Sequence, residues 1–158
     1  FHYYFFALIL LIINRLCDSL DGPMARLSSP TPLGGYLDIV SDFTIYSGFV
    51  LAFGLSDSNN IVVSILLLFL YIGTGTTFLA KAAIKTQIDS FDERYKFKTK
   101  IPKSFYYSSG LIEGTETSIY MVLCLLWPSF YIYLSVVFGI LCLITFVSRV
   151  VVCYKEFI

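Results

Sequence analysis

Five long apolar runs, separated by polar breaks, are the feature that most constrains the fold of this chain. A helix needs about 20 mostly apolar residues to cross the hydrocarbon core of a bilayer, so runs of this length predict membrane-spanning helices. Hydrophobic residues make up 57% of the 158 residues and charged residues only 14%, which leaves too few polar side chains to cover a water-soluble globule. We therefore expect an all-α membrane protein, a bundle of about five transmembrane helices.

The polar breaks set the limits of the predicted spans. These spans cover about Phe1–Cys17, Tyr36–Gly54, Ile61–Lys85, Ser104–Trp127 and Phe130–Val152. The first run opens without an initiator Met, a charged flank or a signal-peptide cleavage site. We therefore expect residues 1–158 to be one transmembrane domain that is truncated at its N-terminus.

The positions of the cations predict the orientation of these spans. If the five helices cross the bilayer alternately, the loop around Pro30, the charged stretch Thr86–Lys103 and the C-terminus lie on one side. All 11 Lys and Arg residues lie in or beside those three segments, and the opposite loops carry none. The positive-inside rule then places these segments in the cytoplasm.

Charge and cysteine content exclude two further classes of function. The formal net charge is +0 at pH 7, and the aromatic residues lie in apolar runs rather than among basic residues, so we expect no nucleic-acid binding. The four cysteines, Cys17, Cys124, Cys142 and Cys153, lack a metal-ligand spacing such as CxxC. We expect them to be free thiols.

Four aspartates gather at the predicted cytoplasmic ends of the first two spans. Asp18 and Asp21 are three residues apart, about 60° on a helix, and Asp38 and Asp42 are four apart, about 40°. Each pair therefore shares a helix face, and the short loop between the spans folds one pair against the other. Converging carboxylates repel one another unless a cation neutralises them. Mg²⁺ or Mn²⁺ suits such hard oxygen ligands.

Each aspartate taken alone has a simpler explanation, as a helix cap or a side chain in headgroup water. The flanking small residues favour a binding site instead, because they let a ligand or a second helix approach closely. They are Gly22, Ala25, Gly34 and Gly35. Arg26 adds a cation with a geometry suited to phosphate, although it also fits plain anchoring at the membrane surface.

These residues form a recognisable pattern. Residues 18–26 read DSLDGPMAR, followed by Gly34, Asp38 and Asp42. The pattern resembles the signature of the CDP-alcohol phosphatidyltransferases, DxxDGxxAR followed by GxxxDxxxD. The interval between Arg26 and Gly34 is one residue shorter than the usual family spacing. Gly35 would restore the interval but break the GxxxD step, so we assign Gly34 to the motif.

The resemblance extends along most of the chain. The runs GTGTTFLA and KSFYYSSGLIEGTET are similar to a bacterial inner-membrane branch of the family whose acceptor alcohol is unknown. Members have six membrane helices with the signature on the second and third, so these five spans would be helices two to six. The resemblance implies an inner-membrane enzyme whose active site faces the cytoplasm. It also implies a homodimer, for which Gly73 and Gly75 in the third span offer slight support.

Site residues follow from the resemblance position by position. It implies that Asp18, Asp21 and Asp38 hold one divalent ion, that Asp38 and Asp42 hold a second, and that Asp42 is the general base. The CDP moiety would be bordered by Gly22, Ala25, Arg26, Thr31 and Gly34. The implied reaction belongs to phospholipid biosynthesis: a phosphatidyl group passes from a CDP-alcohol such as CDP-diacylglycerol to an acceptor alcohol, and CMP leaves. Both ions would be Mg²⁺ or Mn²⁺, and the site would lie among membrane lipids.

A candidate acceptor pocket involves the fourth and fifth spans. Glu113 and Glu116 are three residues apart in the polar half of the fourth span, and buried acids in such a place often line a wet cavity. They could shape a pocket with Lys103 and Arg149, or form an internal ion pair that only fixes helix packing. The basic residues could likewise bind a phosphorylated acceptor or extend to the membrane surface.

Two other classes of function fit parts of the pattern. Intramembrane prenyltransferases also use Asp-rich motifs with Mg²⁺ on diphosphate substrates, but those motifs lack the GxxAR insert. A cation transporter would place acids along its pathway, whereas the aspartates here cluster at one mouth of the bundle.

Overall fold

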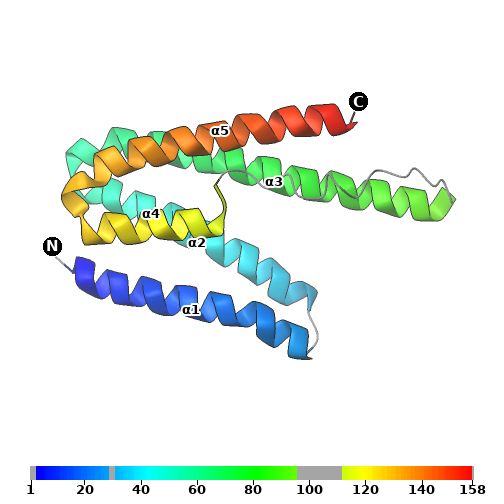
Figure 1. The fold of residues 1–158 in the computed structure, drawn as a ribbon, viewed down its shortest axis with the longest axis horizontal. Coiled ribbons are helices and arrows are strands. Elements are labelled where there is room, and N and C mark those ends of the chain that lie inside the picture. The colour runs from blue at the N-terminus through cyan, green and yellow to red at the C-terminus, as the bar shows by residue number, and fades with distance from the viewer. Residues whose placement is uncertain (1–2, 29–30, 96–111, 158) are drawn as a thin grey trace.

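The computed structural model describes residues 3–28, 31–95 and 112–157, with the side-chain surroundings of 21–28, 89–95 and 157 left out. Within these residues the chain is helical and has no strand (Figure 1). The elements are α1 (Tyr4–Ser28), α2 (Pro32–Ser56), the 3-10 helix η1 (Ser58–Asn60), α3 (Ile61–Tyr95), α4 (Gly114–Leu126), the 3-10 helix η3 (Pro128–Phe130) and α5 (Tyr131–Phe157). The predicted all-α class with five helices is confirmed.

Three segments of the described chain are long and apolar enough to cross a membrane. They are Pro32–Ser56, Ser58–Ile88 and Pro128–Glu156. Helix α4 is a shorter apolar helix of 13 residues. The N-terminal part of the predicted fourth span, residues 104–111, lies outside the described residues. Many large apolar side chains of these helices point outward, as expected where lipid replaces water.

Helix α3 differs from its prediction at its C-terminal end. The charged segment after Lys85 was expected to be a break, but the helix continues to Tyr95. A helix that has already formed extends at low cost, because each further residue adds one backbone hydrogen bond. In Figure 1, α3 extends beyond the other helices at this end.

Polar side chains fix both ends of α2. Thr31 is the N-cap, and its hydroxyl oxygen accepts a hydrogen bond from the backbone N–H of Gly34 at 3.1 Å, with Pro32 in the first turn. At the other end, the Asp57 side chain caps η1, and the Asn60 amide donates to the backbone carbonyl of Phe53 at 3.1 Å. These bonds make a tight α2–α3 hairpin.

The core lies where α2, α3, α4 and α5 meet. Two stacked ring pairs cross it: Phe53 with Tyr131 at 4.4 Å between centroids, and Tyr120 with Phe138 at 4.3 Å. Buried hydroxyls are paired across helices, for example Tyr131 with Ser64 at 2.7 Å. Packing is closest between α3 and α5, which lie side by side in Figure 1, whereas α1 packs mainly on α4.

Small residues allow these close approaches. A Cβ atom on Gly54 would lie 2.9 Å from the Cβ of Ser64, and one on Gly73 would lie 3.2 Å from the ring of Phe146. A Cβ on Gly75 would collide with the ring of Phe43. Gly73 and Gly75 therefore serve packing inside the chain, and they no longer support the predicted homodimer.

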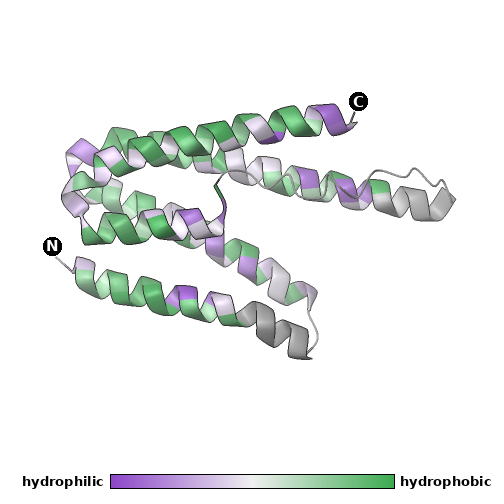
Figure 2. Cartoon of the chain, viewed as in Figure 1, coloured by the Kyte–Doolittle hydropathy of each residue, from purple (hydrophilic) through white to green (hydrophobic). Residues whose placement is uncertain are grey.

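Hydrophilic residues gather toward one end of the bundle. Figure 2 shows them at the start of α2, in the second half of α3 and at the end of α5, while the opposite ends of these helices are mostly apolar. This distribution places the signature aspartates of α2 and the cations of α3 and α5 at the same end.

The Gly54 contact gives a first prediction. In Gly54→Ala the new methyl group meets a Cβ atom that cannot rotate away, so α2 and α3 must separate, and we expect the free energy of unfolding to fall by about 1–3 kcal/mol. Gly48→Ala is the matched control in the same helix, because nothing lies within 4 Å of its Cβ position. Thermal unfolding in detergent measures both, and equal stability of the two variants would contradict the close approach.

Candidate active site

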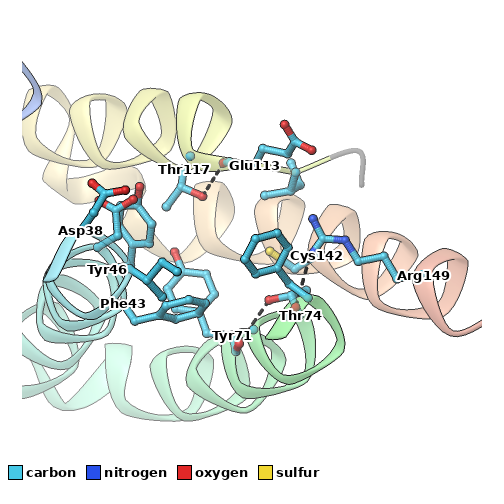
Figure 3. A pocket seen from close by; sticks show the side chains of 15 residues that line it. Asp38, Phe43, Tyr46, Tyr71, Thr74, Glu113, Thr117, Cys142 and Arg149 are labelled. Atoms are coloured by element: carbon cyan, nitrogen blue, oxygen red, sulfur yellow. Dashed lines mark hydrogen bonds between the residues drawn. The ribbon is translucent and has the colours of Figure 1, made fainter. Parts of the chain in front are cut away.

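A cavity of about 360 Å³ lies between α2, α3, α4 and α5. Figure 3 shows side chains from all four helices converging on it. Its lining residues are Asp38, Ile39, Asp42, Phe43, Tyr46, Tyr71, Thr74, Gly75, Phe78, Ile112, Glu113, Gly114, Thr117, Cys142 and Arg149. The cavity therefore combines signature residues of α2 with residues from three helices outside the signature.

One wall carries two acids from successive turns of α2. Asp38 and Asp42 are four residues apart and so lie on one helix face, with Tyr46 a further turn along. The Oδ1 atom of Asp42 is buried and accepts no hydrogen bond from the described residues. A buried carboxylate oxygen without a hydrogen bond is costly unless a cation lies close to it.

The cation next to Asp42 is Arg15 of α1. Its Nη1 atom lies 3.0 Å from Asp42 Oδ1 and 3.4 Å from Asp18 Oδ2, and it donates a hydrogen bond to the Tyr46 hydroxyl at 3.0 Å. The remaining nitrogens of this guanidinium, Nε and Nη2, donate to the Asn14 amide oxygen at 3.0 and 2.7 Å. Arg15 therefore lies between Asp18 of α1 and Asp42 of α2, and each of its three guanidinium nitrogens has a polar contact.

Asp18 lies just past the apolar part of α1 and is close to two acids of α2, Asp42 and Asp38. Burial raises the pKa of Asp18, and repulsion from Asp42 raises it further. Arg15 opposes these effects, while Asp38 adds to the increase. The described acids are thus close enough to repel one another, and one guanidinium offsets this repulsion only in part.

The opposite wall of the cavity carries Arg149 of α5. Its Nη1 donates to the backbone carbonyl of Thr74 at 3.1 Å, and its guanidinium lies 5.8 Å from the centre of the Phe78 ring. Among the described residues, the ion pairs join other cations: Arg15 to Asp18 and Asp42, and Lys81 to Glu156. A half-buried arginine inside a membrane helix without a carboxylate partner indicates a functional site.

Tyr71 of α3 adds an unpaired polar group. Its hydroxyl oxygen is buried and has no hydrogen-bond partner among the described residues, although the side chain lines the cavity. Buried hydroxyls are normally hydrogen-bonded, so this one favours a ligand or a water in the cavity.

The start of α4 forms the third wall. The backbone N–H of Ile112 donates to the Thr145 hydroxyl of α5 at 3.0 Å, which fixes the chain just before Glu113. The carboxylate of Glu116 accepts the backbone N–H of Glu113 at 3.0 Å and so caps the helix. Glu113 therefore lines the cavity, whereas Glu116 lies outside the lining and serves the helix end.

The acids fit a hard divalent ion by donor type but are not gathered around one. Among the side chains that the structure describes, no three of His, Cys, Asp and Glu are close enough to hold a metal. The buried Asp42 Oδ1 and the adjacent Asp18 and Asp38 carboxylates are the oxygen ligands that Mg²⁺ and Mn²⁺ prefer. Arg15 occupies the position beside Asp42.

Comparison with known proteins decides the family. The sequence profile of the family described as CDP-alcohol phosphatidyltransferase matches residues 1–151. This chain belongs to the CDP-alcohol phosphatidyltransferase family. Inner membrane protein YnjF of Escherichia coli (strain K12) is 42% identical over 154 residues, which covers 94% of this chain and 70% of that protein. No solved structure matches the chain.

The structure brings together part of the predicted phosphatidyltransferase site. Asp18 and Asp42 both contact Arg15, Asp38 lies close to Asp18, and Glu113 and Arg149 lie on the cavity. Thr31 caps α2 through its bond with Gly34. The remaining predicted side chains fall outside those described, namely Asp21, Gly22, Ala25, Arg26 and Lys103.

Sequence reasoning missed Arg15, Tyr46 and Tyr71. Arg15 was counted only as a flanking cation, but it precedes Asp18 by three residues, and Tyr46 follows Asp42 by four. Both spacings place the side chains on the helix faces that carry the aspartates, so the spacing alone could have predicted that Arg15 and Tyr46 belong to the site. No sequence signal indicates Tyr71, because its role depends on how α3 packs.

The Thr145 contact gives a second prediction. Thr145→Val removes the hydroxyl that accepts the Ile112 N–H, and leaving this buried donor unpaired costs about 1–3 kcal/mol of stability. Thr76→Val is the control, because Thr76 is exposed and bonds only within its own helix. Thermal unfolding of both variants is the measurement. Equal losses would show that the contact does not anchor the start of α4.

Proposed function

We propose that this protein transfers a phosphatidyl group from a CDP-alcohol, such as CDP-diacylglycerol, to an acceptor alcohol in phospholipid biosynthesis. Family membership supports the reaction class. The observation that carries the proposal is the cavity, which has signature acids Asp38 and Asp42 on one wall and Arg149 on another. Such a cavity can bring an acceptor alcohol next to the diphosphate of the nucleotide.

The acids of the signature are proposed to hold the diphosphate end of the donor through Mg²⁺ or Mn²⁺. Asp18, Asp21 and Asp38 are the candidates for one ion, and Asp38 and Asp42 for a second. When bound, two such ions would neutralise the diphosphate and stabilise the departing phosphate oxygen. Gly22, Ala25, Arg26, Thr31 and Gly34 are the candidate contacts of the CDP moiety.

Asp42 is the proposed general base. The acceptor hydroxyl oxygen attacks the phosphorus that carries the lipid, its proton passes to the Asp42 carboxylate, and the bond from that phosphorus to the CMP oxygen breaks. A base must reach the hydroxyl directly or through one water. Asp42 lines the cavity one helical turn beyond Asp38, so its carboxylate shares this space with an acceptor that enters from the side of Arg149.

The acceptor is proposed to occupy the part of the cavity near Arg149. Because Arg149 has no carboxylate partner among the described residues, it favours an acceptor that carries an anionic group such as a phosphate. Glu113 at the start of α4 lines the same space and can bind hydroxyls of the acceptor. Lys103 is a further candidate from the sequence.

The protein is proposed to lie in a bacterial inner membrane with this site facing the cytoplasm. The similarity to inner membrane protein YnjF of Escherichia coli supports the location. The gathering of cations supports the orientation, since Lys81 and Lys85 lie in the second half of α3 and Arg149 and Lys155 in the second half of α5.

Turnover of defined substrates tests the function. Full-length protein in lipid nanodiscs with Mg²⁺ should release CMP from CDP-diacylglycerol when the correct acceptor is present, and mass spectrometry should detect the new phospholipid. Suitable acceptors for the screen are serine, inositol, inositol phosphate, glycerol phosphate and lipid glycerols. Release of diphosphate from a prenyl diphosphate would support a prenyltransferase instead, and metal flux into vesicles without CMP release would support a transporter.

Two aspartate variants separate catalysis from binding. Asp42→Asn keeps an oxygen ligand but cannot accept the proton, so we expect turnover to fall by about a hundredfold or more while binding of the ions and of CDP-diacylglycerol is largely retained. Asp38→Asn should lose both, because Asp38 is the candidate for the ligand shared by the two ions. Turnover is followed by CMP release and binding by titration. Near-normal CMP release by Asp42→Asn would exclude its role as base.

Arg149 variants test the acceptor site. Arg149→Gln removes the charge that would pair with an anionic acceptor, so we expect the KM for the acceptor to rise about tenfold or more with a smaller effect on the KM for CDP-diacylglycerol. Lys155→Gln is the control, since Lys155 is an exposed cation on the same helix and outside the cavity lining. An unchanged acceptor KM in Arg149→Gln would remove Arg149 from the acceptor site.

A further inference from the structure

Arg15 has more contacts than an anchoring residue at the membrane surface requires. A single guanidinium nitrogen meets an acid of α1, an acid of α2 and a phenol: Asp18 at 3.4 Å, Asp42 at 3.0 Å and Tyr46 at 3.0 Å. Its side chain is only 16% exposed. The guanidinium is also close to the face of the Tyr46 ring, at 5.4 Å from its centre.

These contacts link two helices that otherwise pack little on each other. Helix α1 packs mainly on α4. The α1–α2 ion pair of the described residues runs from Arg15 to Asp42. Repulsion between acids on the two helices disfavours this arrangement unless a cation lies between them. Arg15 supplies that charge.

The contact with Asp42 has a consequence for ion binding. Asp42 Oδ1 is buried and has Arg15 as its close charged neighbour. A divalent ion bound to this carboxylate would lie within a few ångströms of the guanidinium, and two cations at that separation repel strongly in a partly buried site. A divalent ion at Asp42 Oδ1 would therefore compete with the guanidinium for this oxygen.

We infer that Arg15 is a resident counter-cation that holds the acid cluster together before metal binding and leaves Asp42 when a divalent ion binds there. The inference rests on the proposed metal-dependent function and extends it to the state without metal. Tyr46 and Asn14 then act as positioning residues, since their oxygens accept hydrogen bonds from Arg15. Arg15 thereby sets the metal affinity of the Asp42 site without serving as a ligand.

Metal titration tests this competition without reference to turnover. Full-length protein in nanodiscs is titrated with Mn²⁺, and free Mn²⁺ is followed by electron paramagnetic resonance. In Arg15→Gln we expect the Kd for Mn²⁺ to fall by about fivefold or more, because the like charge is removed. Lys81→Gln is the matched control: it removes a cation from the ion pair with Glu156, whose atoms are 2.8 Å apart, away from the cluster. Its Kd should match that of the wild type.

A double-variant comparison tests whether Asp42 is the group for which Arg15 and the metal ion compete. In an Asp42→Asn background, Arg15→Gln should no longer tighten Mn²⁺ binding, because the carboxylate for which the two cations compete is gone. An equal effect in both backgrounds, or an unchanged or weaker affinity in Arg15→Gln, would overturn the inference. Circular dichroism verifies that each variant is folded.

Chemical modification of the wild-type protein gives an answer even if Arg15 variants fail to fold. Phenylglyoxal modifies accessible guanidinium groups, and mass spectrometry gives a rate for each arginine. Saturating Mn²⁺ should speed modification of Arg15 severalfold, with Arg149 as the internal comparison that stays constant. A constant Arg15 rate would overturn the inference. Lack of Mn²⁺ binding by the wild type would overturn both the inference and the proposed metal dependence, whereas Mn²⁺ binding without an Arg15 effect leaves the proposed function intact.

Discussion

The repulsion between carboxylates at the mouth of the bundle is the constraint on which the site depends. Burial and the nearby acids Asp42 and Asp38 of α2 raise the pKa of Asp18 on α1. A cation beside these acids offsets their mutual repulsion. In the described structure Arg15 fills this role between Asp18 and Asp42, and no three of the described acids are close enough together to hold a metal.

Small residues control the space beside these acids. A Cβ atom on Gly114 would lie 3.2 Å from the Tyr46 hydroxyl, and one on Gly75 would meet the Phe43 ring. The two glycines thus bring α4 and α3 against the face of α2 that carries Asp38 and Asp42. The Thr145 hydroxyl holds the chain before Gly114 in place. The cavity is therefore bounded by close backbone approaches, which keep its walls near the acids.

The sequence predicted the helices better than their ends and partners. The apolar runs predicted the positions of α2 and α5 well, because the insertion of a helix into lipid depends on the hydrophobicity of its own residues. The end of α3 was misplaced, since an existing helix can extend into a charged segment by adding one backbone hydrogen bond per residue. The signature identified Asp18, Asp38 and Asp42 by spacing. Arg15 and Tyr71 were not identified, because their significance depends on which side chains other helices bring to them.

The signature and the proposed acceptor site lie on different helices, which explains why family membership indicates the reaction class but leaves the acceptor open. The signature lies on α1 and α2, where it carries the groups proposed for the nucleotide and the ions. The acceptor would instead meet Arg149 on α5, Tyr71 on α3 and Glu113 at the start of α4. Discrimination among alcohols is a difference in free energy between competing ligands, so it would rest on these polar groups and on which of them each candidate leaves unpaired. An acceptor without an anionic group would leave the Arg149 guanidinium uncompensated inside a membrane helix, which is the physical reason to rank phosphorylated alcohols above neutral ones.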